Sequence, residues 1–221
     1  MDEIRLIDVK EAILSDNQDL ADQIRDQLKS SNVFMLNIMA SPGAGKTSLI
    51  LETIRRIEDD FRIGIIEGDI ESVVDSEKVA ALGIPVVQLR TGGACHLDAA
   101  MINEALKTMD LKAFDLVIVE NVGNLVCPAE FDIGAMRKAM ILSVPEGDDK
   151  VLKYPLMFSV CDALVVNKTD YLPLSDFNTV SLQERVRKLN PQIEIFETSC
   201  RTGQGIDDWC RWLRREISRS N

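Results

Sequence analysis

The sequence has no long hydrophobic run, because no apolar stretch approaches the roughly 18 residues that a membrane-spanning helix needs. Its first residues also lack a basic region followed by an apolar core, which is the pattern of a secretory signal. Positive charge is scarce: 25 lysines and arginines are outnumbered by 36 aspartates and glutamates, which gives a net charge of −11. These absences argue against a membrane or a nucleic acid as the main partner and predict a soluble, cytoplasmic protein.

Histidine and cysteine are also few. His96 is the one histidine, and the five cysteines form an odd number at irregular spacing. A framework of disulfides is therefore not expected in a chain of this intracellular character. Each cysteine is interpreted instead as a metal ligand or as a small buried side chain, and Cys161, Cys200 and Cys210 are assigned a structural role.

Repeats, low-complexity tracts and glycine- and serine-rich linkers are absent, so the 221 residues suit one domain with a short appendage. From residue 33 onward, short apolar runs alternate with amphipathic segments. The runs predict strands at 33–39, 63–67, 85–89, 115–120, 139–144, 163–167 and 193–197. The amphipathic segments predict helices at 48–57, 72–82, 97–109, 176–189 and 206–217. This alternation predicts an α/β fold with a mostly parallel, twisted sheet of about seven strands and helices on both faces.

Residues 1–31 are polar and acidic, with apolar side chains at helical spacing. They predict an amphipathic helical extension that precedes a single domain at 32–221. The sequence leaves open a break near residues 15–17. It also leaves open whether the helix packs on the main sheet or on a partner.

The segment Ala40 to Thr47 reads Ala-Ser-Pro-Gly-Ala-Gly-Lys-Thr and lies between a predicted strand and a predicted helix. Backbone N–H groups that point into such a turn, at the positive end of a helix dipole, form a site for the β-phosphate of a nucleotide. The pattern predicts a P-loop in which Lys46 reaches the β- and γ-phosphates and the Thr47 hydroxyl binds Mg²⁺. Ala40 replaces the usual first glycine, which is acceptable at a strand end if φ is negative. The predicted nucleotide-binding residues of the loop are Gly43, Ala44, Gly45, Lys46, Thr47 and Ser48.

A second motif, Asn-Lys-Thr-Asp at 167–170, follows a predicted strand and is typical of a guanine-binding turn. The Asp170 carboxylate accepts from guanine N1–H and the 2-amino group, whereas adenine has an acceptor at N1 and no 2-amino group. A buried group left unpaired costs about 1–3 kcal/mol, so GTP is predicted to bind in preference to ATP, which disfavours an ATP-dependent kinase. Asn167 is expected to bond to the base edge and the P-loop, and the Lys168 stem to pack over the ring. The backbone N–H groups expected to donate to guanine O6 are those of Ser199 and Cys200.

Hard oxygen ligands for Mg²⁺ follow the predicted strands at the same edge of the sheet. The predicted ligands are Thr47, Asp69 and Glu120. Glu120 and Gly123 have E-x-x-G spacing, in which the glycine N–H senses the γ-phosphate. Asp75 is predicted to orient the attacking water, with Lys46 as the other catalytic residue, so that the site hydrolyses GTP. A solvated helix residue is the alternative interpretation of Asp75.

Cys95, His96 and Cys127 lie in loops that follow neighbouring predicted strands, so two thiolates and one imidazole can meet. Sulfur and imidazole nitrogen favour Zn²⁺, Ni²⁺ or copper over Mg²⁺. Three ligands are one short of a closed tetrahedral site, and water or a second chain across a two-fold axis would complete it. Burial of the cysteines as small apolar side chains is the alternative, and a nucleophilic Cys–His pair is less favoured by the geometry of sequence neighbours.

Together these segments resemble the HypB family of hydrogenase nickel-incorporation GTPases, which belong to the SIMIBI class of dimerising P-loop NTPases. The resemblance covers about residues 33–217 in order and rests on the segments 41–47, 91–99, 120–128, 146–150, 153–155 and 167–170. The Cys-His-Leu-Asp-Ala and Glu-Asn-Val-Gly-Asn-Leu-Val-Cys-Pro stretches within them are specific to that family.

The resemblance implies a slow, regulatory GTPase that works as a homodimer and binds Ni²⁺ or Zn²⁺ at its interface through Cys95, His96 and Cys127. It also implies delivery of nickel to the large-subunit precursor of [NiFe]-hydrogenase with the help of a HypA-type nickel chaperone, which the first helix is positioned to dock. Many family members carry an N-terminal histidine-rich tract or cysteine motif, and neither is present here, so a role in nickel storage is not expected.

Two other functions remain open from the sequence. A GTPase chaperone of another metalloenzyme, such as the urease-activating relatives, would share the nucleotide motifs but should lack the Cys95–His96 pair and Cys127. A metal-binding scaffold with vestigial hydrolysis would keep the metal ligands and lose dependence on GTP turnover.

Overall fold

The structure, a computed structural model, describes residues 9–69 and 79–220. Within them seven strands form one sheet in the order β3-β2-β4-β1-β5-β6-β7, and every neighbouring pair is parallel. The strands are β1 (Phe34–Ala40), β2 (Ile63–Asp69), β3 (Val86–Arg90), β4 (Leu116–Glu120), β5 (Arg137–Ser143), β6 (Ala163–Asn167) and β7 (Glu194–Glu197). The predicted fold class is confirmed, and all seven strands lie within about two residues of their predicted bounds.

Helices connect the strands. They are α1 (Val9–Ser30), α2 (Lys46–Ile57), α4 (Ala99–Lys107), α5 (Cys127–Glu130), α6 (Lys150–Lys153), α7 (Pro155–Val160), α8 (Thr179–Leu189) and α9 (Ile206–Ser220). Short 3₁₀ turns lie at Leu111–Ala113, Val144–Glu146 and Thr169–Leu174. Sequence periodicity did not predict α5, α6 or α7, because helices of one or two turns are too short to show a repeat. Most of the helix predicted at 72–82, including Asp75, falls outside the described residues.

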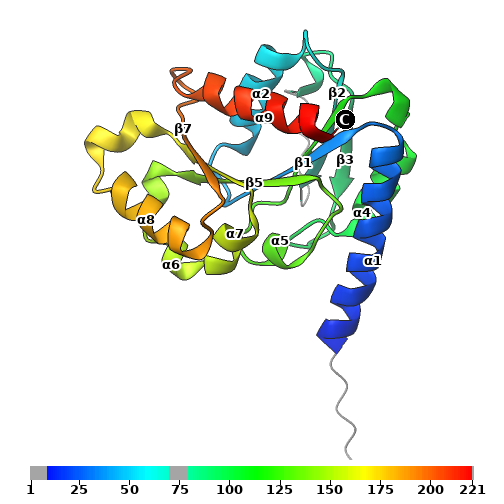
Figure 1. Ribbon diagram of the computed structural model, residues 1–221, viewed down its shortest axis with the longest axis horizontal. Coiled ribbons are helices and arrows are strands. Elements are labelled where there is room, and N and C mark those ends of the chain that lie inside the picture. Colours follow the sequence, from blue (N-terminus) through cyan, green and yellow to red (C-terminus); the bar gives the residue numbers. More distant parts are fainter. Residues whose placement is uncertain (1–8, 70–78, 221) are drawn as a thin grey trace, which may run out of the picture.

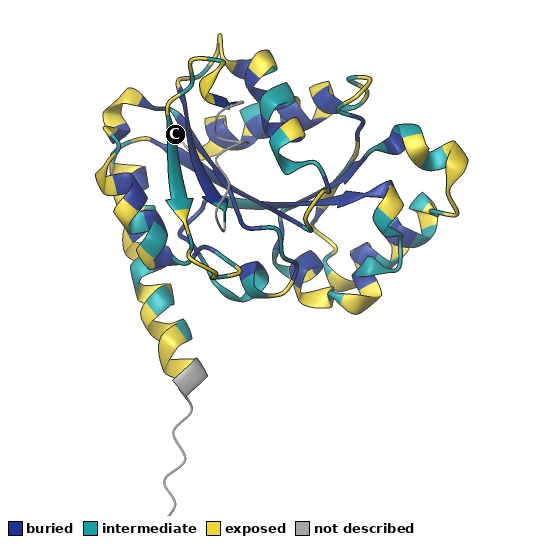
Figure 2. Cartoon of the chain, turned by 180° about the vertical axis from the view of Figure 1, so that it is seen from behind, coloured by how far each residue is buried: buried dark blue, intermediate teal, exposed yellow. Residues whose placement is uncertain are grey.

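The sheet lies between two layers of helices (Figure 1), with α2 and α9 on one face and α1, α4 and α6 to α8 on the other. In strand β1, successive side chains point to opposite faces of the sheet. Phe34, Leu36 and Ile38 pack in the core under α2 and α9, while Met35 packs in the core under α1 and α4. Figure 2 shows the central strands buried on both sides, as expected for a parallel sheet.

Helix α1 runs without interruption through residues 15–17, so the break that the sequence left open does not occur. Its C-terminal half packs on the main domain through Ala21, Ile24 and Leu28, which are buried against α4 and the sheet. Its N-terminal half projects beyond the sheet (Figure 1), and Ile13 there is 51% exposed. The apolar spacing therefore predicted the helix correctly, and its C-terminal half packs on the main domain.

The carboxyl ends of the strands meet at one edge of the sheet. There β1 leads into the loop that opens α2, β4 ends at Glu120, and β6 ends at Asn167. In the strand order, β4, β2 and β3 lie to one side of β1, and β5, β6 and β7 lie to the other side. Such a reversal of strand order leaves a crevice outside the strand ends, which is where ligands bind in open α/β sheets.

Candidate functional site

The loop between β1 and α2 has the conformation of a phosphate-binding turn. Gly43 and Gly45 have φ values of +75° and +103°, which residues with a Cβ rarely adopt, and Gly45 precedes the first residue of α2. Ala40 is not among the described residues with positive φ, so alanine is tolerated at the position where glycine is usual. The N–H groups of the first turn of α2 therefore face a site suited to an anion.

A cavity of about 300 Å³ lies beside this turn. Lys46 lines it together with the carboxylates of Glu67, Asp69 and Glu120. The Thr47 hydroxyl donates to Glu120 Oε1 at 2.9 Å, so two of the predicted Mg²⁺ ligands are in contact. A hydroxyl and several carboxylates beside a phosphate site are the hard oxygen donors that Mg²⁺ prefers, and these residues would hold the ion that neutralises the phosphates.

Sequence reasoning missed the position of Glu67. It is buried and lies directly across from Glu120 in the pairing of β2 with β4, which places two acidic strand residues side by side. An acidic residue inside a buried parallel strand was the available signal, because such strands are otherwise almost entirely apolar.

A second cavity, of about 390 Å³, lies between α2 and the turn that follows β6. Its lining includes Gly45 and Ser48, predicted for the P-loop, and Asn167, Lys168, Asp170 and Cys200, predicted for the base. Asp170 Oδ1 accepts from the Ser199 hydroxyl at 2.7 Å, and the Arg201 guanidinium lies 3.7 Å from the other carboxylate oxygen. The carboxylate is thus held at the cavity by neighbours on the following loop.

The turn after β6 is tied to the P-loop, as predicted. Asn167 Nδ2 donates to the Ala44 carbonyl at 3.1 Å, and Lys168 Nζ donates to the Gly43 carbonyl at 2.7 Å. A Cβ on Gly45 would lie 2.5 Å from Asn167 Nδ2, so the close approach of the two loops requires glycine. The turn after β6 and the P-loop are therefore in direct contact.

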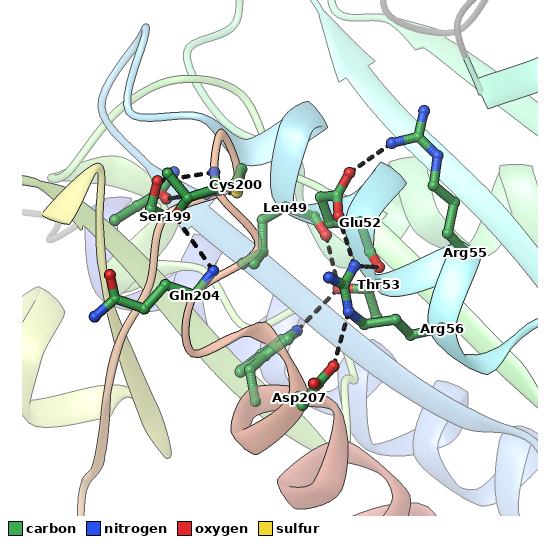
Figure 3. Close-up of polar contacts among 12 residues, drawn as sticks. Leu49, Glu52, Thr53, Arg55, Arg56, Ser199, Cys200, Gln204 and Asp207 are labelled. Carbon is green, nitrogen blue, oxygen red and sulfur yellow. Dashed lines mark hydrogen bonds and ion pairs between the residues drawn. The ribbon is translucent and has the colours of Figure 1, made fainter. Parts of the chain in front are cut away.

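Figure 3 shows the loop after β7. The Ser199 N–H donates to the Gln204 carbonyl at 3.0 Å, and the Cys200 N–H makes a long bond of 3.4 Å to Asn167 Oδ1. Of the two N–H groups predicted for guanine O6, Ser199 is therefore already engaged and Cys200 is only weakly held. Burial raises the pKa of Cys200 to about 11, so its thiol stays protonated at neutral pH.

Charged residues of α2 form the outer wall of the same cavity. Glu52 forms ion pairs with Arg55 and Arg56, and Arg56 forms a further ion pair with Asp207 on α9 at 2.9 Å (Figure 3). Burial raises the pKa of Glu52, but hydrogen bonds from the two arginines outweigh it and keep that pKa below its ordinary value. Glu52 and Arg55 both line the cavity, and no sequence motif had indicated them.

The predicted metal ligands come together in one cluster. Cys95 and His96 follow β3, and Cys127 is the first residue of α5 after β4. The Sγ atoms of Cys95 and Cys127 are 3.1 Å apart, and Cys95 Sγ lies 3.8 Å from His96 Nδ1. All three ligand atoms fall within 4.8 Å of one another, which suits one thiophilic cation.

The surroundings of the cluster shift the pKa of Cys127 and that of His96. The neighbouring Cys95 thiol, together with burial, raises the pKa of Cys127. Burial lowers the pKa of His96, whose ring packs on Phe131 with centroids 4.0 Å apart. A neutral imidazole is ready to bind a metal, whereas the thiols must lose protons when the cation arrives.

Residues 120–127 join the metal cluster to the phosphate cavity. Asn121 is fully buried, and its Oδ1 accepts from the N–H of Leu97 at 3.1 Å, the residue after His96. Gly123 packs on Pro42 of the P-loop so closely that a Cβ there would lie 2.9 Å from the proline ring. Asn124 Nδ2 donates to the Cys95 carbonyl at 3.2 Å. Glu120 and Cys127 therefore begin and end a segment that touches both sites.

This architecture defines a P-loop nucleotide-binding protein with a cluster of two cysteines and one histidine that residues 120–127 connect to the phosphate cavity. A family model described as "CobW/HypB/UreG, nucleotide-binding domain" matches residues 37–197. The chain belongs to this family, and within it to the HypB proteins, as the following relatives demonstrate.

Among curated proteins, the hydrogenase maturation factor HypB of Azotobacter vinelandii is 42% identical over 96% of this chain and 70% of its own length. The hydrogenase/urease maturation factor HypB of Helicobacter hepaticus is 40% identical over 90% of this chain and 84% of its own. The crystal structure of HypB from Helicobacter pylori in complex with nickel superposes with a TM-score of 0.87 at 36% identity, covering 92% of this chain and 96% of that one. The HypB structure from Archaeoglobus fulgidus gives 0.86 at 38% identity, with 92% and 99% covered.

No helix in the described part of the chain is both long enough and apolar enough to cross a membrane.

Proposed function

We propose that the chain is a GTP-hydrolysing nickel metallochaperone that assists nickel insertion into [NiFe]-hydrogenase. The observation that carries this proposal is the meeting of Cys95, His96 and Cys127 on loops that also contact the phosphate cavity. A cytoplasmic maturation factor needs a reversible metal site whose occupancy responds to nucleotide. Contact between the two sites provides the physical route for such a response.

The nucleotide half of the proposal assigns GTP to the two cavities at the strand ends. Lys46 and the N–H groups of residues 43–48 would hold the phosphates, and Thr47, Asp69 and Glu120 would hold Mg²⁺. Asp75 keeps its proposed role of orienting water. The nucleotide-binding domain would span residues 32–221, with residues 1–31 as a helical extension.

The metal half assigns Ni²⁺ or Zn²⁺ as cargo of the cysteine and histidine cluster. Two sulfurs and one nitrogen exclude Mg²⁺ as the preferred ion, and the Helicobacter pylori relative was crystallised with nickel. The maturation role named for the relatives supports delivery of the metal to a hydrogenase precursor. The HypA-type chaperone is part of the proposal because the sequence resemblance implies it.

A homodimer would complete the metal site, since the described part of one chain supplies three ligands. The surface beside the cluster suits a second copy: Val126, Leu152 and Leu156 are large apolar side chains that are 50%, 65% and 47% exposed. Helices α5 and α7, which carry Cys127 and Leu156, pack against each other, so this apolar surface adjoins the metal ligands.

Two variants separate the two halves of the function. Lys46→Ala should abolish binding of a fluorescent GTP analogue, because a cation on the phosphates is lost. Cys95→Ala should retain GTP hydrolysis and lose nickel binding. A scaffold with vestigial hydrolysis would instead leave nickel delivery intact in Lys46→Ala, and this result would overturn the proposal.

Guanine selectivity is tested at Asp170. Asp170→Asn removes a charged acceptor for two guanine donors, and we expect GTP affinity to fall by at least about tenfold. Asp176→Asn, on the exposed loop beyond this turn, serves as the control and should bind GTP normally. Equal affinity of the wild type for ATP and GTP would contradict the assignment.

The Helicobacter hepaticus relative is named for both hydrogenase and urease maturation, which favours urease as a second recipient of the metal. Maturation assays with each apoenzyme would distinguish the recipients.

A further inference from the structure

Asn17, in the middle of α1, bonds to a residue shortly after each of the two segments that carry the metal cluster. Its Oδ1 accepts from the Ala99 N–H at 2.9 Å, and its Nδ2 donates to the Asp132 carbonyl at 2.8 Å. Ala99 comes three residues after His96, and Asp132 comes five residues after Cys127. One amide therefore joins two segments that are far from it, and from each other, in the sequence.

The first of these bonds provides a hydrogen-bond acceptor for a backbone N–H group at the start of α4. Ala99 is the first residue of α4, and the N–H groups of a first turn have no acceptor within their own helix. Asp98 caps the N–H of Met101 at 2.8 Å, and Asn17 takes that of Ala99. The start of α4, and with it the segment that carries Cys95 and His96, is thus held from outside by α1.

The second bond holds the segment that follows Cys127. Asp132 lies next to Phe131, whose ring packs on the His96 ring. Asn17 therefore bonds to the neighbour of a residue that contacts a predicted metal ligand. The Asp132 carboxylate pairs with Arg25 of α1 and with Lys138. The segments that follow both parts of the metal cluster are therefore bonded to α1.

Close packing holds the part of α1 that is C-terminal to Asn17 against the domain. Gly134 sits so near the helix that a Cβ there would lie 2.7 Å from the Ala21 carbonyl and from Ile24. Beyond Asn17, toward the N-terminus, the described side chains of α1 are mostly exposed, and the helix leaves the domain (Figure 2). Asn17 thus lies where the anchored part of α1 gives way to its projecting part.

We propose that Asn17 is a positioning residue for the metal site, which makes α1 part of that site although α1 lies outside the family-matched residues 37–197. The proposal rests on the proposed function, since it requires that Cys95, His96 and Cys127 bind nickel. Asn17 holds the two ligand loops at the separation that a single cation needs. Residues that orient metal ligands from behind typically change metal affinity 10- to 100-fold when they are removed.

The test is a nickel titration of the full chain, monitored by thiolate-to-nickel charge-transfer absorbance. Asn17→Ala should weaken nickel binding about tenfold or more and change the absorbance spectrum, while affinity for a fluorescent GDP analogue stays unchanged. The matched control is Gln18→Ala, because among the described residues the Gln18 amide bonds to Asp22 of the same helix, at 3.2 Å, and not to either ligand segment. It should bind nickel as the wild type does.

A second variant separates the two bonds. Asn17→Asp keeps an acceptor for the Ala99 N–H and loses the donor to Asp132, so nickel affinity should still fall while the Ala99 amide stays protected from hydrogen exchange. In the wild type, nickel should slow amide exchange in α1 around Asn17, a readout that needs no substitution.

The outcomes are distinct. If wild type binds nickel through Cys95 but Asn17→Ala binds it equally well, or nickel leaves exchange in α1 unchanged, the role of Asn17 is overturned and the proposed function stands. Equal losses of nickel and nucleotide affinity in Asn17→Ala would indicate general destabilisation and would also overturn it. If the wild type binds no nickel, or Cys95→Ala binds it normally, the proposed function itself fails.

Discussion

At the scale of single residues, the two glycines of the P-loop have different reasons to be glycine. Both have positive φ, but a Cβ on Gly43 would meet nothing within 4 Å, whereas one on Gly45 would collide with Asn167. Gly43 is therefore required by backbone conformation alone. Gly45 is required by conformation and by the close approach of the turn that follows β6.

This difference predicts unequal effects of alanine. Gly43→Ala should cost stability by about 1–2 kcal/mol from the left-handed conformation alone. Gly45→Ala carries the same strain and must also displace Asn167, so its affinity for a fluorescent GDP analogue should fall at least about tenfold further. Thermal melting and fluorescence titration of both variants measure the two effects. Equal nucleotide affinities would mean that the Gly45 contact does not matter.

The five cysteines also differ in burial and in surroundings. Cys161 and Cys210 are buried, and burial raises the pKa of Cys210 to about 11, which agrees with the structural role predicted for them. Cys95 is exposed beside Cys127. Cys200, assigned to the structural group, lines the base cavity as well.

At the scale of elements, α1 is fastened to the domain by a partly buried charge cluster. Asp132 lies between Arg25 of α1 and Lys138 at the start of β5. Burial raises the pKa of Asp132, but the Lys138 charge, the Gly134 N–H and the Arg25 charge outweigh it and hold that pKa below its ordinary value. The ionised carboxylate thus stabilises the contact between the helix and the sheet.

The lowered pKa predicts how stability depends on pH. The contribution of Asp132 should be fully present above the unfolded-state pKa of about 4 and should be lost as the pH falls through the lower folded-state pKa. Asp132→Asn should lower the free energy of unfolding by about 1–3 kcal/mol at pH 7, and its deficit relative to wild type should shrink at acid pH. Urea unfolding of both proteins across this range is the measurement. A deficit that does not change with pH would contradict the charge-based explanation.

Helix α9 shows a second kind of fastening. Trp209 and Trp212 are buried and stack with ring centroids 5.0 Å apart, as the stripe of this helix predicted. The Trp209 indole N–H donates to the Thr53 hydroxyl on α2 at 2.9 Å. The helix that leads out of the guanine loop is thereby fixed to the helix that leads out of the P-loop.

At the scale of the whole molecule, nucleotide and metal sites share one edge of the sheet and the segment 120–127. If a second copy completes the metal site, GTP should promote assembly and metal binding together. We expect the dimer fraction and the nickel stoichiometry to rise in parallel when a non-hydrolysable GTP analogue is added. Sedimentation during a nickel titration measures both, and tight nickel binding by a strict monomer would contradict the model of a shared site.

The surface of that dimer can be tested with a matched pair of variants. The double variant Leu152→Ala and Leu156→Ala removes apolar area beside the metal loops and should reduce the dimer fraction. Leu174→Ala removes a side chain that is even more exposed, at 84%, but lies on the turn that follows the guanine motif. It should leave the dimer fraction unchanged.

Much of this organisation could be predicted from the sequence. The P-loop, the guanine turn and the seven strands are local patterns, because hydrogen bonding in a turn and the burial of a short apolar run depend on neighbouring residues. The metal ligands Cys95, His96 and Cys127 were predicted from their strand-end positions, and the structure brings them within 4.8 Å of one another. Helices of one or two turns, such as α5, carry no period that a sequence can display.

The sequence by itself therefore determined the class of fold, and it predicted a phosphate site, a base site and a set of metal ligands. Only the tertiary structure decided how these parts are joined: Asn121 beneath Leu97, Gly123 against Pro42, and Asn17 between the two ligand loops. Such contacts link residues up to 115 positions apart, as Asn17 and Asp132 are. Local propensity carries no information about them, because packing of the helices on the sheet sets their distances.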